Sequence, residues 1–288
     1  MRSFKVCLVS AEVVPYAKTG GLADVAQGLA RSLARLGHDI RVVMPMYRRV
    51  REGGHPLEHV PGLQDVAFQI GGRRMYFSVS SAHLPGSTAT VYFVRCPELY
   101  DRAGIYTQDS DEHLRFAALC VASVRLCQQL GWAPDVFHCN DWHTGLLPLY
   151  LWTHFAWDAL FKHSRVVMTI HNIGYQGVVG ADKVGELGLE NERNLLHQED
   201  LKAGQLNLLK TGLLYSNAIT TVSKTYAAEI LEPELGMGLE TTLRQRKSDL
   251  FGSSTAWTTR IGIQPRMRIW PTTILRRTCA EKRAANKR

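Results

Sequence analysis

The sequence predicts an α/β fold in which helices flank a mostly parallel β-sheet. Two observations predict this class. Short apolar, β-branched segments of strand length alternate with segments of helical periodicity along most of the 288 residues. Strands that are separated by helices pair in parallel through right-handed crossovers. The second observation is that polar, glycine-bearing loops follow several of the strand segments. We find no internal repeat.

A strand, a glycine-rich loop, a helix and a second strand open the chain. Residues 4–10, FKVCLVS, are apolar and β-branched and predict a buried strand. Residues 22–36 place apolar side chains at spacings of three and four, which predicts an amphipathic helix. Gly37 ends this helix, and residues 39–47, DIRVVMPMY, predict the second strand.

The middle of the chain continues the alternation. Two segments, 65–82 and 88–97, predict antiparallel strands, with a turn at the glycine pair 71–72. The second half of segment 98–132 predicts a helix, with Asp109 to Asp111 as candidate N-cap residues. The elements expected after it are strand 134–141, helix 144–155, strand 165–177 running into a loop, a helix within 194–217, strand 218–223 and a final helix.

The basic excess of the chain lies at one end. The formal net charge is +8, yet residues 253–288 hold nine Lys or Arg and one Glu, and residues 1–252 hold 25 basic and 25 acidic side chains. A neutral body does not predict a nucleic-acid partner. No apolar run is long enough to span a membrane, and the apolar start is itself the first strand, so we expect no membrane span and no signal peptide. Six cysteines without a CxxC pair predict buried thiols in a reducing cytoplasm.

Three loops follow predicted strands and carry polar side chains. They span residues 11–21, 138–145 and 170–177. Ligands bind at the carboxyl ends of the strands in a parallel sheet, so we expect the three loops to form one site. A fourth loop contains Ser223 at the start of a helix, and we interpret Ser223 as a helix cap.

The first loop has the chemistry of a phosphate-binding loop. Gly20 and Gly21 lack Cβ atoms, so their N–H groups can approach a ligand closely. The helix that follows begins with unpaired N–H groups and a partial positive charge. Lys18 adds a full charge beside Thr19. A solvated lysine at an ordinary helix start is the alternative, because KTGG matches neither the dinucleotide fingerprint nor the P-loop.

Other kinds of site have less support. His138, Asp141, His143 and His171 lack a standard metal-ligand spacing, so we expect no metal. The G-x-S-x-G motif of hydrolases and the G-x-G-x-x-G motif of NAD enzymes do not occur, and we expect no cofactor. A second KTG, at 210–212, lies in a helical pattern and is interpreted as a coincidence.

Six segments carry a resemblance to a known family. In chain order they are AEVVPYAKTGGLADV, LYDRAGIY, DVFHCNDWHTGLLPLYL, TIHNIGYQG, LKTGLLYSNAITTVSKTYAAEI and GMGLETTLRQR. Together they resemble the N-terminal half of bacterial glycogen synthases and plant starch synthases. The resemblance implies that residues 1–252 are the Rossmann-like N-terminal domain of a two-domain GT-B glycosyltransferase. It also implies retaining transfer of glucose from ADP-glucose to the non-reducing end of an α-1,4-glucan in glycogen biosynthesis.

The resemblance implies roles for single residues. The residues that it places at ADP-glucose are Lys18, Thr19, Gly20, Gly21, Asn172 and Tyr175. Asp141 and His171 would be catalytic and line the glucosyl pocket, with His171 hydrogen-bonding sugar oxygens. Other interpretations stay open for two of these residues: Asp141 as a helix N-cap and Tyr175 as a packing residue.

Residues 253–288 depart from the family's pattern. The family continues with a linker and a second domain that holds most of the donor site, so we expect this chain to be truncated and inactive alone. Read one nucleotide out of frame, the codons of this segment can spell a sequence like the family's continuation. In that frame Trp257 followed by Thr258 forces aspartate, and Trp270 followed by Pro271 forces alanine, as the continuation requires. We interpret the segment as an aberrant, disordered basic tail produced by a frameshift.

Two alternative functions stay open. The chain could belong to a different GT-B glycosyltransferase that uses a UDP-sugar. It could also be a non-catalytic, glucan-binding remnant. Donor assays separate the first alternative from an ADP-glucose enzyme, and glycogen co-sedimentation without turnover favours the second.

Overall fold

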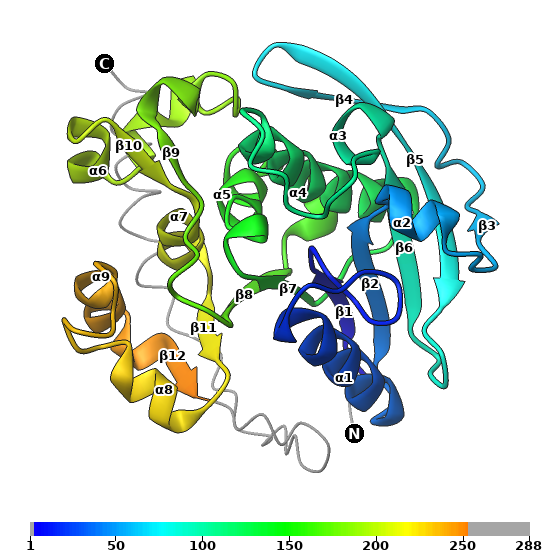
Figure 1. Ribbon diagram of the computed structural model, residues 1–288, viewed down its shortest axis with the longest axis horizontal. Helices are drawn as coiled ribbons and strands as arrows, with labels where there is room; N and C mark the ends of the chain where they lie inside the picture. The colour runs from blue at the N-terminus through cyan, green and yellow to red at the C-terminus, as the bar shows by residue number, and fades with distance from the viewer. Residues whose placement is uncertain (1–2, 253–288) are drawn as a thin grey trace. The chain divides into compact units, whose positions relative to one another are not determined.

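The computed structural model describes residues 3–252, and residues 1–2 and 253–288 lie outside the described residues. The interpretation of the basic tail as a disordered frameshift product falls on that undescribed segment. Within residues 3–252 the chain forms an α/β fold around a ten-stranded sheet, with helices beside it (Figure 1). The predicted fold class is confirmed.

The sheet is parallel at its centre and along one edge. Its strands are β1 (Lys5–Val9), β2 (Asp39–Pro45), β3 (Glu58–His59), β4 (Val66–Ile70), β5 (Arg73–His83), β6 (Thr90–Arg95), β7 (Val136–Asn140), β8 (Arg165–Ile170), β11 (Ala218–Thr221) and β12 (Leu250–Gly252). Their order is β12-β11-β8-β7-β1-β2-β6-β5-β3, with β4 paired to β5. Every pair from β12 to β6 is parallel. The partners of β5, which are β3, β4 and β6, run antiparallel to it.

Helices and short 3₁₀ turns connect the strands. The helices are α1 (Gly21–Arg35), α2 (Arg48–Glu52), α3 (Pro97–Tyr100), α4 (Glu112–Gln129), α5 (Leu147–Trp152), α6 (Gln198–Lys202), α7 (Leu208–Tyr215), α8 (Lys224–Glu229) and α9 (Glu240–Gln245). The 3₁₀ turns are η1 (Trp142–Thr144), η2 (Ala159–Phe161), η3 (Ala181–Val184), η4 (Glu190–Leu195) and η5 (Lys247–Asp249). Helix α4 packs against α5, and α5 packs against α7, so these three helices form one layer (Figure 1).

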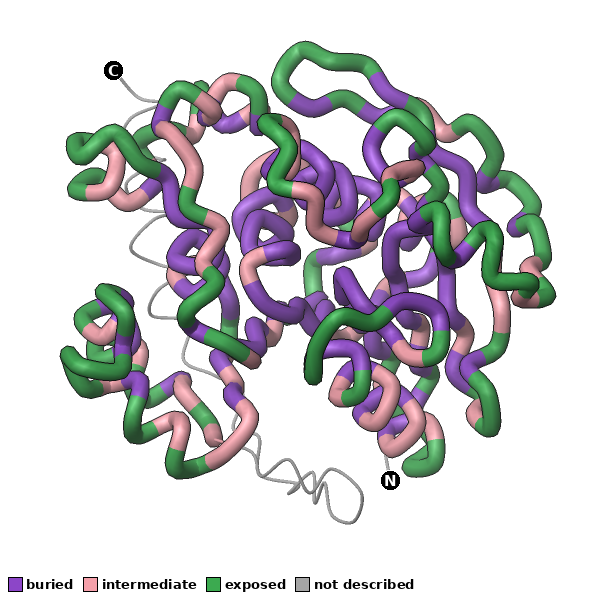
Figure 2. Tube along the Cα trace, viewed as in Figure 1, coloured by how far each residue is buried: buried purple, intermediate pink, exposed green. Residues whose placement is uncertain are grey.

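The core lies between the central strands and this helical layer. In β1, β2 and β7 nearly every residue after the first is buried, as parallel strands covered on both faces must be. Helix α4 is buried without interruption from His113 to Val124, and Figure 2 shows this helix mainly in purple. Its apolar residues therefore surround the helix instead of forming one stripe, and this helix anchors the loops around it.

Several local predictions are confirmed. Gly71 and Gly72 form the turn between β4 and β5, and both have positive φ values, 54° and 82°. The side chain of Ser223 accepts the N–H of Tyr226 and caps α8. The second KTG, at 210–212, lies inside α7.

Three local predictions differ from the structure. Asp111 occupies the N-cap position of α4, but its side chain binds Arg102 and makes no capping hydrogen bond. The predicted helix 144–155 is shorter, because η1 precedes it and α5 spans only Leu147–Trp152. The helical segment before residue 216 is divided, because Gly204, with φ 75°, ends α6 and the next residues form β10 (Gln205–Asn207), paired with β9 (Val178–Gly180).

Two further observations bear on the class of protein. The five described cysteines are free and buried, as the sequence predicts, and these are Cys7, Cys96, Cys120, Cys127 and Cys139. Among residues 3–252, no helix has both the length and the apolar character that a membrane span requires.

Candidate active site

The three polar loops leave the sheet from neighbouring strands. They follow β1, β7 and β8, and β7 pairs in parallel with both β1 and β8. Their carboxyl ends therefore lie side by side at one edge of the sheet. The expected convergence of the three loops is present in the structure.

The glycine loop after β1 is closed by an acidic residue of the same loop. Glu12 is only 2% exposed. Its carboxylate accepts the backbone N–H of Thr19, the Thr19 hydroxyl at 2.6 Å and the backbone N–H of Gly20 at 3.3 Å. One of the two glycine N–H groups predicted to face a ligand is thus bound within the chain, while that of Gly21 begins α1.

Lys18 is exposed beside this closed loop. Its Nζ lies 2.7 Å from Oδ2 of Asp24 in the first turn of α1, and the two side chains are 52% and 54% exposed. Arg49, which lies in α2, donates to the Lys18 carbonyl oxygen at 3.3 Å and so holds the glycine loop in place. Exposed ion pairs contribute little to stability, so Lys18 can exchange Asp24 for another anion at small cost.

Neither Gly20 nor Gly21 is required by the fold. A Cβ atom on either residue would meet no other atom within 4 Å. Gly20 has φ −141° and ψ −161°, which any residue adopts, and Gly21 is the first residue of a helix. The first N–H groups of a helix have no partner within it. Glycine at these two positions leaves the backbone open to close approach from outside.

Asp141 is buried in a left-handed conformation where the second loop begins. Its φ is 54°, which is uncommon for a residue other than glycine. Oδ1 accepts the backbone N–H of His171 at 2.8 Å and that of Asn172 at 3.5 Å, so Asp141 ties the second loop to the third. Asp141 does occupy the N-cap position of η1, as the alternative interpretation expects, but its side chain makes no capping hydrogen bond there.

Burial also changes the proton affinity of Asp141. Loss of solvation raises the pKa of its carboxyl to about 7, and the charge of Glu12 acts in the same direction. The two N–H groups that bind Oδ1 favour the ionised form and limit the rise. At neutral pH this carboxyl is therefore partly protonated.

His171 is held in one orientation by its neighbour on β7. Its Nε2 lies 2.9 Å from Oδ1 of Asn140. The Asn140 amide donates to the Val9 carbonyl oxygen at 2.9 Å, which fixes its oxygen toward the histidine. Nε2 is then the donor, and Nδ1, which is buried and has no partner within the described chain, is a free acceptor. Burial lowers the pKa of His171 to about 3, so the ring is neutral at pH 7.

A stack of aromatic rings supports the second loop. The ring of His143 lies parallel to that of Tyr106, with centroids 5.0 Å apart, and meets Phe116 edge-on at 4.6 Å. Burial lowers the pKa of His143 to about 3. The Tyr106 hydroxyl donates to Glu12, so this stack also reaches the glycine loop.

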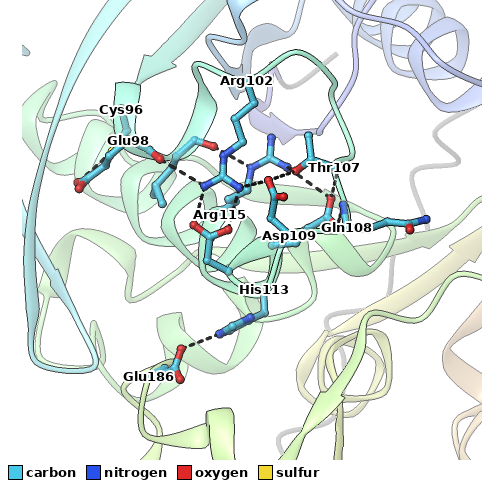
Figure 3. Close-up of polar contacts among 12 residues, drawn as sticks. Cys96, Glu98, Arg102, Thr107, Gln108, Asp109, His113, Arg115 and Glu186 are labelled. Atoms are coloured by element: carbon cyan, nitrogen blue, oxygen red, sulfur yellow. Dashed lines mark hydrogen bonds and ion pairs between the residues drawn. The ribbon is translucent and has the colours of Figure 1, made fainter.

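Two arginines clamp the loop that carries Tyr106 (Figure 3). Arg102 binds Asp109 and Asp111, and this ion-pair cluster is why neither carboxylate caps α4. Arg115 has no exposed surface and donates to the carbonyl oxygens of Leu99 at 2.8 Å and Ile105 at 2.9 Å. The loop between α3 and α4 is therefore a fixed wall of the site.

The third loop places Asn172 and Tyr175 at the surface. The Asn172 side chain is exposed and accepts the N–H of Gly174 at 3.0 Å. Tyr175 is 67% exposed and lines a groove of about 700 Å³ together with Trp142 and Met237. The interpretation of Tyr175 as a packing residue is wrong, because a packed tyrosine would be buried.

The described residues hold no group of three or more His, Cys, Asp or Glu side chains arranged for a metal ion. His138 lies in β7 and is buried, with its Nε2 3.3 Å from the Thr169 hydroxyl. Burial lowers the pKa of His138 to about 4. It is a neutral core histidine that supports the site from within the sheet.

Three residues of the site were missed by reasoning from the sequence. They are Glu12, Tyr106 and Asn140. One signal was available for Glu12, because an acidic residue directly after a buried strand and inside a glycine-bearing loop needs a partner. Nothing in the sequence joins Tyr106 to Glu12, since 94 positions separate them.

Comparison with known proteins identifies relatives of this chain. The family model described as "starch synthase catalytic domain" matches residues 5–245. Glycogen synthase 1 of Geobacter sulfurreducens is 40% identical over 258 residues, which cover 88% of this chain and 51% of that protein. Glycogen synthase of Desulforudis audaxviator is 40% identical over 260 residues, with coverage of 87% and 51%. The chain thus spans about half the length of these curated relatives.

A solved structure shows the same fold. The catalytic domain of starch synthase IV from Arabidopsis thaliana, bound to ADP and acarbose, superposes with a TM-score of 0.78 at 27% identity. The match covers 93% of this chain and 55% of that one. With a matching family model over most of its length, the chain belongs to the family of the starch synthase catalytic domain, a family of GT-B glycosyltransferases.

Proposed function

We propose that this chain provides part of the active site of a retaining glucosyltransferase, which moves glucose from ADP-glucose to the non-reducing end of an α-1,4-glucan such as glycogen. One observation carries the proposal. An exposed glycine loop that carries Lys18 follows the strand next to the one that ends before buried Asp141, and Asp141 is bonded to partly exposed His171 of the third loop. A nucleotide sugar has the same division, with a charged diphosphate next to an uncharged sugar. The ADP and acarbose bound by the plant relative support this interpretation.

The glycine loop binds the diphosphate in this proposal. Lys18 exchanges its partner Asp24 for the phosphates, and the first N–H groups of α1, beginning at Gly21, point toward the same charge. The diphosphate is the leaving group, and its negative charge grows as the glycosidic bond breaks. Positive groups that are already in place stabilise that transition state without reorganising. Thr19 and Gly20 give the loop its shape through Glu12.

The second and third loops bind the glucosyl group. The neutral ring of His171 is partly exposed and forms a hydrogen bond with a sugar oxygen, and Asn172 lies beside it in the third loop. The reacting sugar acquires oxocarbenium-ion character, so hydrogen bonds to its hydroxyl groups strengthen in the transition state. In its ionised form, the Asp141 carboxylate stabilises the positive charge on the ring. Its bonds to the third loop keep His171 in place during the reaction.

Calorimetric titration of the 288-residue chain with ADP and with UDP tests the donor site. We expect ADP and UDP to bind with similar affinity, because the glycine loop is proposed to recognise the diphosphate that both nucleotides share. Hydrogen bonds to charged groups contribute about 1.5–3 kcal/mol, so Lys18→Ala should weaken ADP binding by about tenfold to a hundredfold. Lys202→Ala is the matched control, because Lys202 is also exposed and paired, with Glu199 at 2.9 Å. Equal ADP affinity in Lys18→Ala and wild type would favour the solvated-lysine interpretation.

Transfer is measured after joining residues 1–252 to the C-terminal half of the Geobacter sulfurreducens glycogen synthase, which the chain does not span. We expect labelled glucose from ADP-glucose to appear in glycogen. A preference for UDP-glucose would support the alternative GT-B transferase. Binding to glycogen without transfer from either donor would support a glucan-binding remnant.

We also place this reaction in the cytoplasm. The five described cysteines are buried thiols without a disulfide, a pattern that suits a reducing compartment. Curated bacterial relatives named glycogen synthase are consistent with this location. Fractionation of the source cells, with the chain detected by an antibody, is the measurement that checks it.

A further inference from the structure

Glu12 is the most heavily bonded carboxylate near the glycine loop. Oε1 accepts the Thr19 hydroxyl at 2.6 Å and the Tyr106 hydroxyl, and Oε2 accepts the backbone N–H groups of Thr19 and Gly20. All four contacts use the carboxylate as an acceptor. A glutamine could keep only half of them, because its NH₂ group faces donors.

The main chain of Glu12 is held as firmly as its side chain. The hydroxyl of Ser10 donates to the Glu12 carbonyl oxygen at 2.7 Å and accepts the Glu12 N–H at 3.3 Å. Ser10 has no exposed surface. The carboxylate therefore cannot swing out of the loop without moving the end of β1.

Glu12 differs in this respect from Asp24, the carboxylate in the first turn of α1 beside this loop. Asp24 is more than half exposed and holds only Lys18, so an incoming anion can replace it. Replacing Glu12 would leave a buried carboxylate without its four donors, which is strongly unfavourable. Two anions cannot share the N–H groups of Thr19 and Gly20.

We propose that Glu12 is a positioning residue of the donor site: its carboxylate stays bound to Thr19 and Gly20 when the nucleotide diphosphate binds, and it joins the glycine loop to the Tyr106–His143 stack. This inference rests on the proposed function, because it names the diphosphate as the ligand. The alternative is that Glu12 occupies the phosphate site only until the ligand displaces it.

The arrangement around Tyr106 supports a fixed role. Arg115 and Arg102 hold the loop on either side of Tyr106 through the backbone and the acidic cluster that Figure 3 shows. The Tyr106 ring is stacked on His143, and its hydroxyl ends on Glu12. The carboxylate is therefore the point where the first loop, the 101–111 loop and the second loop are joined.

The first arm of the test needs no ligand. Amide exchange is measured by NMR on the 288-residue chain labelled with ¹⁵N-threonine and ¹⁵N-glycine, in wild type, Glu12→Gln and Glu186→Gln. Glu186 also binds two side chains, His113 and Lys183, but lies outside the site. We expect Glu12→Gln to speed exchange at Thr19 and Gly20 by about tenfold or more, and Glu186→Gln to leave it unchanged. Unchanged exchange in Glu12→Gln overturns the inference.

The second arm uses ADP as the probe. We expect saturating ADP to leave the Thr19 and Gly20 amides protected, and Glu12→Gln to raise the Kd for ADP by about tenfold. A lower Kd in Glu12→Gln would show that Glu12 competes with the ligand and overturns the inference. A lower melting temperature with an unchanged Kd would show a purely structural role and also overturns it.

Two results keep this test decisive. If Glu12→Gln does not fold, Tyr106→Phe replaces it, because it removes one of the four contacts and keeps the ring on His143. A smaller rise in the ADP Kd supports the inference, and an unchanged or lower Kd overturns it. If the wild-type chain binds no ADP, the proposed function fails at its donor site, and the exchange arm alone then decides whether Glu12 positions the loop.

Discussion

The two sides of the site are built in opposite ways. On the glycine-loop side, Lys18 and Asp24 are more than half exposed, and a Cβ at Gly20 or Gly21 would meet open space. On the other side, Asp141 and His143 are 6% exposed, and their titration is shifted by burial. The exposed residues of the glycine-loop side can be changed with little effect on the fold, whereas the buried residues of the other side cannot.

The comparison distinguishes residues that we expect to affect ligand binding from residues that we expect to affect the free energy of unfolding. Exposed charges contribute little to stability, so a loop made of them can exchange its partners when a ligand arrives. Buried polar groups are fixed by their neighbours, so a change in their charge alters the free energy of unfolding. The predictions below use unfolding free energy to test this difference, from the largest expected change to the smallest.

Acidification should give the largest change, through the buried side. Burial lowers the pKa of His138 to about 4 and those of His143 and His171 to about 3, below the ordinary value of 6.5. The unfolded chain therefore binds more protons, and the stability that these groups contribute is present above pH 6.5 and lost as the pH falls toward 3–4. At about 1.4 kcal/mol per unit for each histidine, the loss reaches roughly 6 kcal/mol by pH 5.

Urea unfolding at pH 7, 6 and 5 measures this loss, of which about 2 kcal/mol is offset by the stability that Asp141 regains between pH 7 and pH 5. The control is His143→Phe, which keeps a ring against Tyr106 and Phe116 but cannot titrate. Its unfolding free energy should fall less steeply with pH than that of wild type, whatever its value at pH 7. A free energy that stays level between pH 7 and pH 5 in wild type would contradict the prediction.

Asp141→Asn should stabilise the fold at neutral pH. Burial raises the pKa of Asp141 from 3.8 to about 7, so its contribution to stability is full below pH 3.8 and is lost as the pH rises through 7. Asparagine keeps an oxygen for the His171 N–H and removes the charge. The variant should gain up to about 4 kcal/mol at pH 7.5 and nothing near pH 4.

The control for Asp141→Asn is Asp111→Asn, and the measurement is unfolding at pH 4 and 7.5. The hydrogen bond from Arg102 lowers the pKa of Asp111, so this variant should lose stability at neutral pH. Glucosyl transfer by the fused enzyme should fall in Asp141→Asn although the fold is firmer. A destabilised Asp141→Asn at pH 7.5 would show that its carboxylate is not under a burial penalty.

Glycine at position 145 should be sensitive, in contrast to Gly20. A Cβ on Gly145 would lie 2.2 Å from the carbonyl oxygen of Leu208, where the second loop packs on α7. Overpacking of this kind costs about 3 kcal/mol, so Gly145→Ala should lower the melting temperature by several degrees. The melting temperature of Gly20→Ala, measured in the same way, should lie within about a degree of the wild-type value. Equal melting temperatures for Gly145→Ala and Gly20→Ala would contradict the prediction.

Lys18→Ala should have the smallest effect on stability. Its ion pair with Asp24 is exposed, so we expect a change within about 0.5 kcal/mol in the same urea experiment. This variant has the large effect on ADP binding that is expected under the proposed function. A loss above 1 kcal/mol would mean that the lysine holds the loop itself.

Much of the fold could be read from the sequence because its signals are local. The helix after Gly21, the strand before Ser10 and the Gly71-Gly72 turn follow from periodicity and turn chemistry. β9 and β10 were missed because three-residue strands carry no periodic pattern. Their pairing depends on a partner some 25 residues away.

The residues of the candidate site could be predicted from the sequence, but the contacts that hold them in place could not. Lys18, Asp141 and His171 were predicted as site residues because each lies in a loop that follows a buried strand. The contacts that hold them in place are long-range, such as Tyr106 with Glu12 or Asn140 with His171. The left-handed backbone of Asp141 likewise has no signal in its own residue type.

The strand order has a consequence that reaches beyond any one side chain. From β1 the chain first builds outward through β2 and β6, then returns to the other side of β1 for β7, β8 and β11. At such a reversal, successive connections cross to opposite faces of the sheet and leave a crevice above the strand where the order turns. The position of the site is thus a property of topology. Substitutions can change what binds there, but moving the crevice would require another order of strands.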